Sequence, residues 1–230
     1  LFKYVSFLNE ETKKILKYKK KKTKIIYFSS IHVYENYNKF KSLSKNLLNS
    51  RTHYAIRNIV CENLLIKRFN SSKKQVHIIR IGNVFGIQSN LKYYSKSMNR
   101  LAINQFCYKI INKQKISIKS NYLECRNYVS INDFINFIKV GFCERKLNFS
   151  TIINYASEKQ FNMRQLVNIL RAQSKKLNLK PKIFFENKIK KSGINYYFDI
   201  SEIKKFKIQP KINFEHEIFS LLKKLKNLNK

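Results

Sequence analysis

Four polar side chains occupy positions where an alternating strand and helix protein builds a catalytic site. Ser30 ends the apolar segment IIYFSS, Tyr54 and Asn58 lie four residues apart in HYAIRNIV, and Asn83 follows the apolar segment VHIIRI. A spacing of four residues places Tyr54 and Asn58 on one face of a helix. Ligands of open α/β sheets bind at the carboxyl ends of the strands. We therefore predict that Ser30, Tyr54 and Asn83 converge on one crevice, where a hydroxyl can act on a bound ligand.

The elements that must position these groups alternate along the chain. Apolar periodicity predicts strands at 25–29, 76–81, 116–118, 152–156 and 183–185, and helices at 2–17, 54–69, 98–111, 132–142, 162–177 and 214–228. Residues 30–52, rich in Asn, Ser and Lys, are predicted to form a loop. Alternation with apolar strands predicts an α/β fold around a parallel sheet. The short mixed elements after residue 98 predict a second, smaller lobe.

Composition and cysteine usage are typical of a globular protein with reduced thiols. The 230 residues are 43% hydrophobic and 27% charged, and no apolar run approaches the length of about 18 residues that a membrane span requires. We therefore expect no membrane partner. The cysteines are far apart and form no CxxC pair: Cys61, Cys107, Cys125 and Cys143. This pattern predicts no metal site and favours the cytoplasm.

The net charge raises the hypothesis of a nucleic-acid partner. Lys and Arg number 48 against 13 Asp and Glu, which gives +35, and KYKKKKTK at 17–24 is the densest patch. Clustered cations follow phosphate backbones. The basic residues are nevertheless spread over the whole chain, and Asn and Ile are also abundant. Asp to Asn and Glu to Lys each need a single G-to-A change, so AT-rich coding explains the charge better than selection for a polyanion.

Five segments carry a resemblance that covers nearly the whole chain. They are, in order, IIYFSSIHVY, HYAIRNIVCENLL, VHIIRIGNVFG, RNYVSINDF and INYASEKQFNMRQLV. Together they resemble the extended short-chain dehydrogenase/reductases, and more narrowly the NAD-dependent epimerase/dehydratase family that acts on nucleotide sugars. The resemblance implies a Rossmann-like sheet. Residues 1–95 would be the remaining part of the NAD-binding domain, and 96–230 mainly a substrate-binding lobe with elements that return to that domain.

The resemblance also implies a role for each polar group. Tyr54 matches the catalytic tyrosine, which exchanges a proton with a sugar oxygen while hydride moves to or from NAD or NADP. Ser30, four residues before Tyr34, matches the hydroxyl that bonds that oxygen. Asn83 matches a residue beside the nicotinamide and sugar. Arg126 matches an arginine that grips the diphosphate of the nucleotide sugar, a task suited to a bidentate donor.

Simpler interpretations stay open for some of these residues. Ser30 could merely cap a loop, and Arg126 could be one more solvated cation in a basic chain. His32 and His53 are interpreted as loop and helix-start residues rather than catalysts.

Two departures from the family pattern bear on activity. The family opens with a glycine-rich turn that binds the dinucleotide pyrophosphate, and the matching part of this chain begins after it. We therefore expect a fragment that binds NAD poorly by itself. Asn58 stands where the Tyr-x-x-x-Lys motif of the family has its lysine. That lysine holds the cofactor ribose and lowers the tyrosine pKa from about 10, whereas Asn keeps a hydrogen bond without the charge.

The resemblance favours one enzyme class and leaves two alternatives. Ile31 and His32 stand where dehydratases of this group carry an Asp-Glu pair, which argues against a 4,6-dehydratase. We predict an NAD- or NADP-dependent nucleotide-sugar epimerase or reductase for surface polysaccharide precursors. The family often dimerises through the helix at 54–69, which implies a homodimer. The alternatives are a non-catalytic relic of this fold, favoured by Asn58, and a basic nucleic-acid-binding protein.

Overall fold

The computed structural model describes most of the chain beyond residue 23. The described residues are 24–34, 52–69, 76–87, 101–119, 123, 125–145, 149, 151–186, 197–211 and 213–228. The helix predicted at 2–17 lies outside these ranges, as does most of the loop predicted at 30–52. No helix among the described residues is long and apolar enough to span a bilayer.

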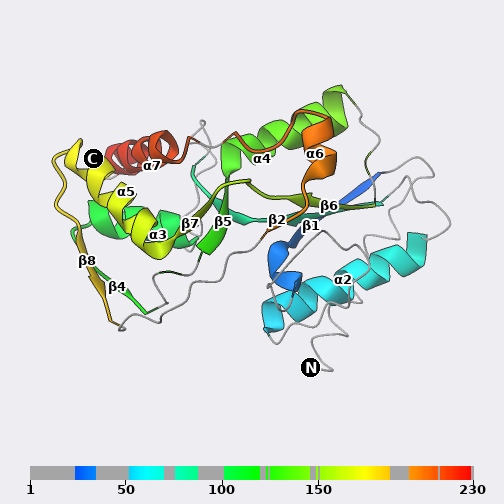
Figure 1. The fold of residues 1–230 in the computed structure, drawn as a ribbon, viewed down its shortest axis with the longest axis horizontal. Helices are drawn as coiled ribbons and strands as arrows, with labels where there is room; N and C mark the ends of the chain where they lie inside the picture. Colours follow the sequence, from blue (N-terminus) through cyan, green and yellow to red (C-terminus); the bar gives the residue numbers. More distant parts are fainter. Residues whose placement is uncertain are drawn as a thin grey trace.

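A parallel sheet forms the first part of the molecule, the sheet region. Its strands are β1 (Ile25–Ser30), β2 (Val76–Ile81) and β6 (Ile152–Tyr155), in the order β1-β2-β6. Helix α2 (His53–Phe69) covers one face, and α4 (Ile131–Ile138) and α6 (Ser201–Lys205) lie on the other (Figure 1). Helix α4 continues as the π-helical turn η5 (Lys139–Glu144). The central strand β2 is buried at every position, as expected for a parallel strand covered on both faces.

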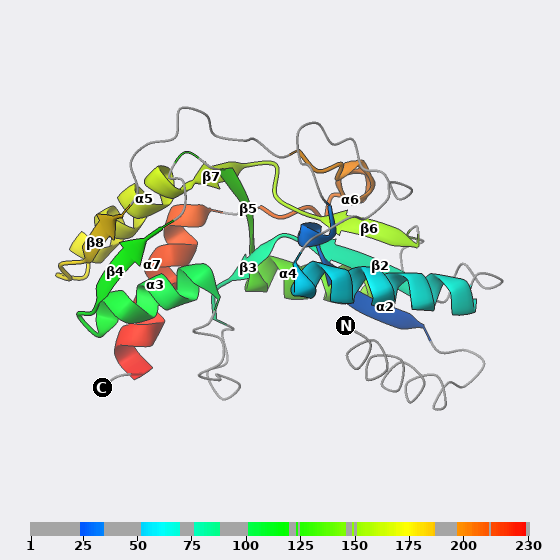
Figure 2. The ribbon, with the colours of Figure 1, turned by 90° about the horizontal axis from the view of Figure 1, so that it is seen from below.

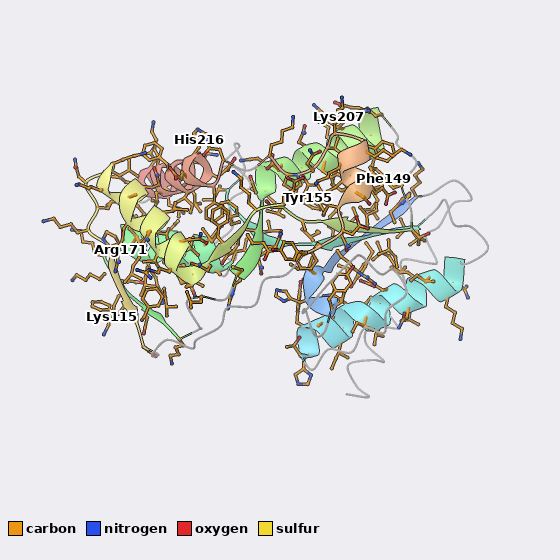
Figure 3. All side chains as sticks on the ribbon, viewed as in Figure 1. Lys115, Phe149, Tyr155, Arg171, Lys207 and His216 are labelled. Atoms are coloured by element: carbon orange, nitrogen blue, oxygen red, sulfur yellow. The ribbon has the colours of Figure 1, made fainter. Side chains whose placement is uncertain are left out.

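Side chains of β2 alternate between the two faces of the sheet. Ile78 packs toward α2 with Leu65, whereas Ile79 belongs to the apolar cluster beneath α4 and α6. Aromatic rings fill that second cluster, and the labelled side chains of Tyr155 and Phe149 lie between the sheet and α4 (Figure 3). The alternation follows from the two-residue period of a strand.

The second part of the molecule, the helical region, packs three helices against a two-stranded sheet. The helices are α3 (Ala102–Ile111), α5 (Met163–Lys175) and α7 (Phe214–Leu228), and the parallel strands are β4 (Lys115–Ile118) and β8 (Lys182–Phe185). Their core is aliphatic and aromatic. Between the two regions lies a third sheet, in which β5 (Cys125–Ser130) pairs with β3 (Asn83–Phe85) and β7 (Gln160–Asn162) (Figure 2).

The chain passes between the two regions repeatedly. It builds β1, α2 and β2 of the sheet region, then α3 and β4 of the helical region, and returns for α4 and β6. It then adds α5 and β8 to the helical region, α6 to the sheet region, and ends in α7 (Figures 1 and 2). Each core is therefore assembled from segments that are distant in the sequence.

The α/β fold with parallel strands confirms the predicted fold class. Strand β2 and helix α7 have the predicted bounds, while α3 begins at Ala102 rather than 98. Strands β3, β5 and β7 and helix α6 were not predicted, because they are short or carry polar residues. The domain boundary at residue 95 stays a prediction.

Candidate active site

A cavity of about 490 Å³ opens at the carboxyl ends of β1 and β2. Its described lining includes Ser30, Tyr54 and Asn83, which come from β1, α2 and β3. His32, on the short 3-10 helix η1 (Ile31–Val33), lines the same cavity. The structure therefore brings three of the predicted site residues together, with one histidine that was interpreted as a loop residue.

Ser30 both caps η1 and faces the cavity. Its hydroxyl oxygen accepts a hydrogen bond from the backbone N–H of His32 at 3.3 Å, and the side chain is only 5% exposed. A hydroxyl that accepts one bond still has a proton to donate. Capping a turn and binding a ligand are thus compatible roles for this serine.

Tyr54 is an exposed aromatic residue at the start of α2. Its side chain is 57% exposed, although the ring lines the cavity. The hydroxyl of Thr52 accepts a hydrogen bond from the backbone N–H of Ala55 at 3.2 Å. This cap fixes the first turn of the helix, where backbone N–H groups lack helical partners, and so fixes the position of Tyr54.

Asn58 turns inward, away from the cavity that Tyr54 lines. Its side-chain amide donates to the backbone carbonyl of Tyr54 at 3.2 Å, and its carbonyl oxygen accepts from the Tyr27 hydroxyl at 2.9 Å. Burial, with a further contribution from the Cys61 thiol, raises the pKa of Tyr27 well above its usual range, which keeps that phenol a donor. Asn58 therefore ties β1 to α2.

Both the nitrogen and the oxygen of the Asn83 side-chain amide have a partner. Its nitrogen donates to the backbone carbonyl of Asn127 at 2.8 Å, and its oxygen lies 3.2 Å from Nε2 of His32. Arg126, the neighbour of Asn127 on β5, is half-buried, pairs with Phe161 in the ladder, and is not among the described residues that line the cavity.

A buried charged pair lies behind the cavity. Arg80 and Glu62 are 1% and 0% exposed, and Nη2 of Arg80 lies 2.6 Å from Oε2 of Glu62. The Ser29 hydroxyl also donates to Glu62. Nη1 of Arg80 donates to the Tyr34 hydroxyl at 3.0 Å, which in turn donates to Asn154 at 2.6 Å. These bonds link α2, β1, β2 and β6.

The environment of Arg80 keeps its guanidinium charged. Burial alone would lower the pKa of Arg80, but the hydrogen bond and charge of Glu62, together with Tyr34, outweigh it and raise the pKa above its ordinary value. Charge-assisted hydrogen bonds have preferred lengths and angles, so a charged side chain with several partners is held in a specific position. The pair therefore ties α2, the helix that carries Tyr54, to the central strand β2.

The family model described as NAD dependent epimerase/dehydratase family matches residues 11–142, which is more than half of the chain. The chain belongs to this family. The match of the family model confirms the resemblance seen in the sequence. A search of curated protein sequences finds no match.

Solved structures of nucleotide-sugar enzymes share the fold of this family member. The UDP-glucuronic acid 4-epimerase from Bacillus cereus, in complex with UDP-glucuronic acid and NAD, has a TM-score of 0.70 at 18% identity over 89% of this chain and 62% of that chain. The UDP-N-acetylglucosamine 4-epimerase of the same organism has a TM-score of 0.63 at 18% identity, over 89% and 65% of the two chains. The UDP-glucose 4-epimerase from Thermotoga maritima, with UDP-glucose, has a TM-score of 0.68 at 15% identity, over 90% and 65%. The chain spans less than two thirds of the length of these proteins.

The lining of the cavity has hydroxyl groups of the kind that one end of an NAD molecule with a sugar beside it would need. The exposed Tyr54 phenol and the Ser30 hydroxyl would suit a sugar oxygen beside a nicotinamide. Asn58, by contrast, is buried: its carbonyl oxygen accepts from Tyr27, one amide N–H is donated to the backbone of Tyr54, and the residue is not among the described lining of the cavity. The 230 residues hold only four glycines and no glycine-rich turn for a pyrophosphate. Among the described residues, the donor set would therefore suit the nicotinamide and sugar end.

Proposed function

We propose that this chain forms the nicotinamide and sugar end of a nucleotide-sugar epimerase or reductase that uses NAD or NADP. The observation that carries the proposal is the meeting of Ser30, Tyr54 and Asn83, from three separate elements, around one cavity. Membership of the family supports the class of cofactor, and the fold shared with UDP-sugar epimerases supports the class of substrate.

In the proposed reaction the bound dinucleotide supplies a hydride acceptor for the sugar carbon. Tyr54 holds at its phenol oxygen the proton that the sugar hydroxyl loses. Ser30 donates its hydroxyl proton to the same sugar oxygen, because the Ser30 oxygen already accepts from His32. Asn83 forms part of the wall in a fixed orientation. A group positioned to move a proton typically contributes about 10²–10⁴-fold to rate.

Arg126 and Asn58 have less direct parts in the proposal. Arg126 would bind the diphosphate of the nucleotide sugar beyond the described lining of the cavity. Asn58 would hold β1 and α2 together rather than assist Tyr54 with charge. This engaged amide is also the observation that favours the second candidate, a non-catalytic relic of the fold.

The proposal includes a cellular setting, for which membership of the family is the only support. We propose that the enzyme acts in the cytoplasm, in the synthesis of surface polysaccharide precursors, as a homodimer that pairs through α2.

Calorimetry tests whether a cofactor binds at all. The full-length protein, titrated with NAD and with NADP, is expected to bind at least one of them. No heat of binding at millimolar dinucleotide would contradict the enzyme proposal and leave the relic as the better explanation.

Substitution of Tyr54 tests the chemistry. Tyr54→Phe in the full-length protein should lower turnover of a panel of UDP-sugars by about 10²–10⁴-fold, because the change removes the phenol oxygen that would receive the proton of the sugar hydroxyl. Tyr197→Phe is the matched control, since Tyr197 is also exposed, at 64%, and is not among the described residues of the cavity lining. Equal turnover in Tyr54→Phe and the unmodified protein would refute the assignment.

Substitution of Asn58 separates the enzyme from the relic. Asn58→Lys should raise turnover and move the pH–rate profile to lower pH, because a cation one helical turn away favours the ionised phenol. The same change removes the bond to Tyr27 and should cost about 1–3 kcal/mol of stability. Lower turnover in Asn58→Lys would mean that Asn58 is an adapted part of the site, and would weaken the relic alternative.

A further inference from the structure

His32 is the group in the cavity that the proposed reaction leaves without a task. It follows Ser30 by two residues, and its side chain is exposed. The centre of its ring lies 6.2 Å from the centre of the Tyr54 ring, with the two planes at 72°. Its Nε2 lies 3.2 Å from Oδ1 of Asn83. The imidazole is thus between the phenol of Tyr54 and a fixed amide.

The hydrogen bonds of Asn83 determine which imidazole nitrogen carries a proton. The Asn83 nitrogen donates to the carbonyl of Asn127 at 2.8 Å, so the Asn83 oxygen is the atom that faces His32. An amide oxygen can only accept, and Nε2 of His32 must therefore donate. In the neutral ring Nδ1 is then bare and basic, and in the protonated ring the bond to Asn83 is kept.

His32 is also the one source of positive charge among the described residues that line the cavity. The titratable side chains of that lining are His32, Tyr54 and Tyr128. Behind the cavity, Arg80 and Glu62 are buried and bonded to each other. Histidine gains and loses a proton near neutral pH. It can therefore accept the proton of a phenol that ionises transiently and return it afterwards.

We propose that His32 is the proton-transfer partner of Tyr54 and supplies the positive charge that Asn58 lacks; the inference rests on the proposed function. The Tyr54 O–H bond breaks and its proton forms an N–H bond at Nδ1 of His32, directly or through one water. The phenolate then takes the proton of the sugar hydroxyl. Both transfers reverse when the sugar hydroxyl reforms, and neither needs an electron acceptor of its own.

The pair has a distinct dependence on pH. The active form holds one of the two protons of the fully protonated pair, and this remaining proton is the one that Tyr54 and His32 exchange. Loss of the remaining proton at high pH leaves the pair with no proton to exchange and ends the assistance. The rate therefore rises and then falls with pH, and the two limits belong to the pair rather than to either residue.

Nuclear magnetic resonance of the chain itself tests the coupling without any cofactor. Tyrosine labelled at the phenol carbon reports ionisation, and Tyr54→Phe assigns the Tyr54 signal. His32→Lys, which keeps a positive charge beside the phenol to high pH, should lower the pH at which Tyr54 ionises by about one unit, or tenfold in the equilibrium. His32→Gln should leave this midpoint unaltered, because a free imidazole is already neutral where a free phenol ionises. His53→Lys, at the exposed start of α2, is the control and should produce a smaller shift. A Tyr54 midpoint in His32→Lys equal to that of the unmodified chain would overturn the proposal.

Turnover of the full-length protein separates this inference from the proposed function. With UDP-sugars and NAD, His32→Gln should lower kcat about tenfold with KM unchanged, and His32→Lys should restore most of it. If Tyr54→Phe abolishes turnover while His32→Gln leaves kcat and its pH limits unaltered, this inference fails and the proposed function stands. If Tyr54→Phe leaves turnover unaltered, the proposed function fails.

Discussion

The sheet region and the helical region are stabilised by different kinds of core. Under α2 the sheet region buries a charged pair, Arg80 and Glu62, together with the hydroxyls of Ser29 and Tyr34. The helical region packs aliphatic and aromatic side chains between α3, α5 and α7. Its buried Asn104 side chain bonds the backbone of Gly86 at 2.8 and 2.9 Å.

The difference shows how each region can serve the site. Apolar contacts are non-directional and mainly remove surface from water. Charge-assisted hydrogen bonds have preferred angles and lengths, so they fix orientation as well as contact. A buried ion pair adds little net stability over an apolar pair of similar volume. We infer that the polar core of the sheet region holds α2 and β1 in register for the cavity, whereas the helical region provides a stable wall.

The largest expected effect comes from breaking the buried pair. Arg80→Leu leaves the Glu62 carboxylate buried without its partner and should lower the free energy of unfolding by about 3–5 kcal/mol, as measured by urea denaturation. The double variant Glu62→Gln with Arg80→Leu removes the stranded charge and should regain part of the loss. If the double variant is as unstable as Arg80→Leu alone, the stability of this core does not depend on pairing the charge.

A smaller loss is expected from the apolar core. Leu170 is fully buried on α5, and Leu170→Ala should lower the free energy of unfolding by about 3 kcal/mol through lost contacts and an unfilled cavity. The signal of Tyr54 should not move, because no polar link from this core to α2 is disturbed. Ile169→Ala, at the partly buried neighbour, should cost less. A displaced Tyr54 signal in Leu170→Ala would remove the distinction between the two regions.

The smallest effect concerns Asp133, where the two regions meet. Burial raises the pKa of Asp133 above 3.8, the nearby Glu217 raises it further, and the backbone N–H of Lys211 opposes the shift with a hydrogen bond at 3.2 Å. An acid whose pKa is raised by folding stays protonated to a higher pH in the native state than in the unfolded state. Its contribution to the free energy of unfolding is therefore complete at low pH and declines as the pH rises through the pKa of the folded state.

Asp133→Asn should flatten that decline. Urea midpoints measured from pH 3.8 upward should fall less with pH in the variant than in the unmodified protein, because Asn cannot ionise. The difference should be small, since the side chain is only half-buried. Parallel pH profiles would show that Asp133 is as well solvated in the folded chain as in the unfolded one.

The sequence predicted those elements of the fold whose residue pattern is compatible with only one type of secondary structure. VHIIRI reads as a buried strand, and β2 is the central strand, covered on both faces. The spacing in α7 likewise matches a helix with one apolar face. Strand β5 was missed because Arg126 and Asn127 interrupt its apolar pattern, and the side chain of Asn127 is used in bonds to Ser157 rather than in the core.

The grouping of residues at the candidate site was predicted to a similar extent, while their roles stay predictions. The rule that ligands bind at strand carboxyl ends was enough to group Ser30, Tyr54 and Asn83. Helical spacing put Asn58 on the side of Tyr54, but it could not show that the Tyr27 hydroxyl draws the amide inward. The place of His32 depends on Asn83 from a distant segment, and no local pattern carries that information.

The repeated passage of the chain between its regions has a consequence for biosynthesis. Ile78 of β2 pairs with Ile152 of β6, and Ile218 of the final helix belongs to the core of the helical region. A nascent chain leaving the ribosome would therefore carry β1, α2 and β2 for much of its translation without their last strand. Both cores close only when the carboxyl-terminal third has been made. Pairing over such sequence distances is slow, so the emerging protein should depend on chaperones that shield β2 until β6 arrives.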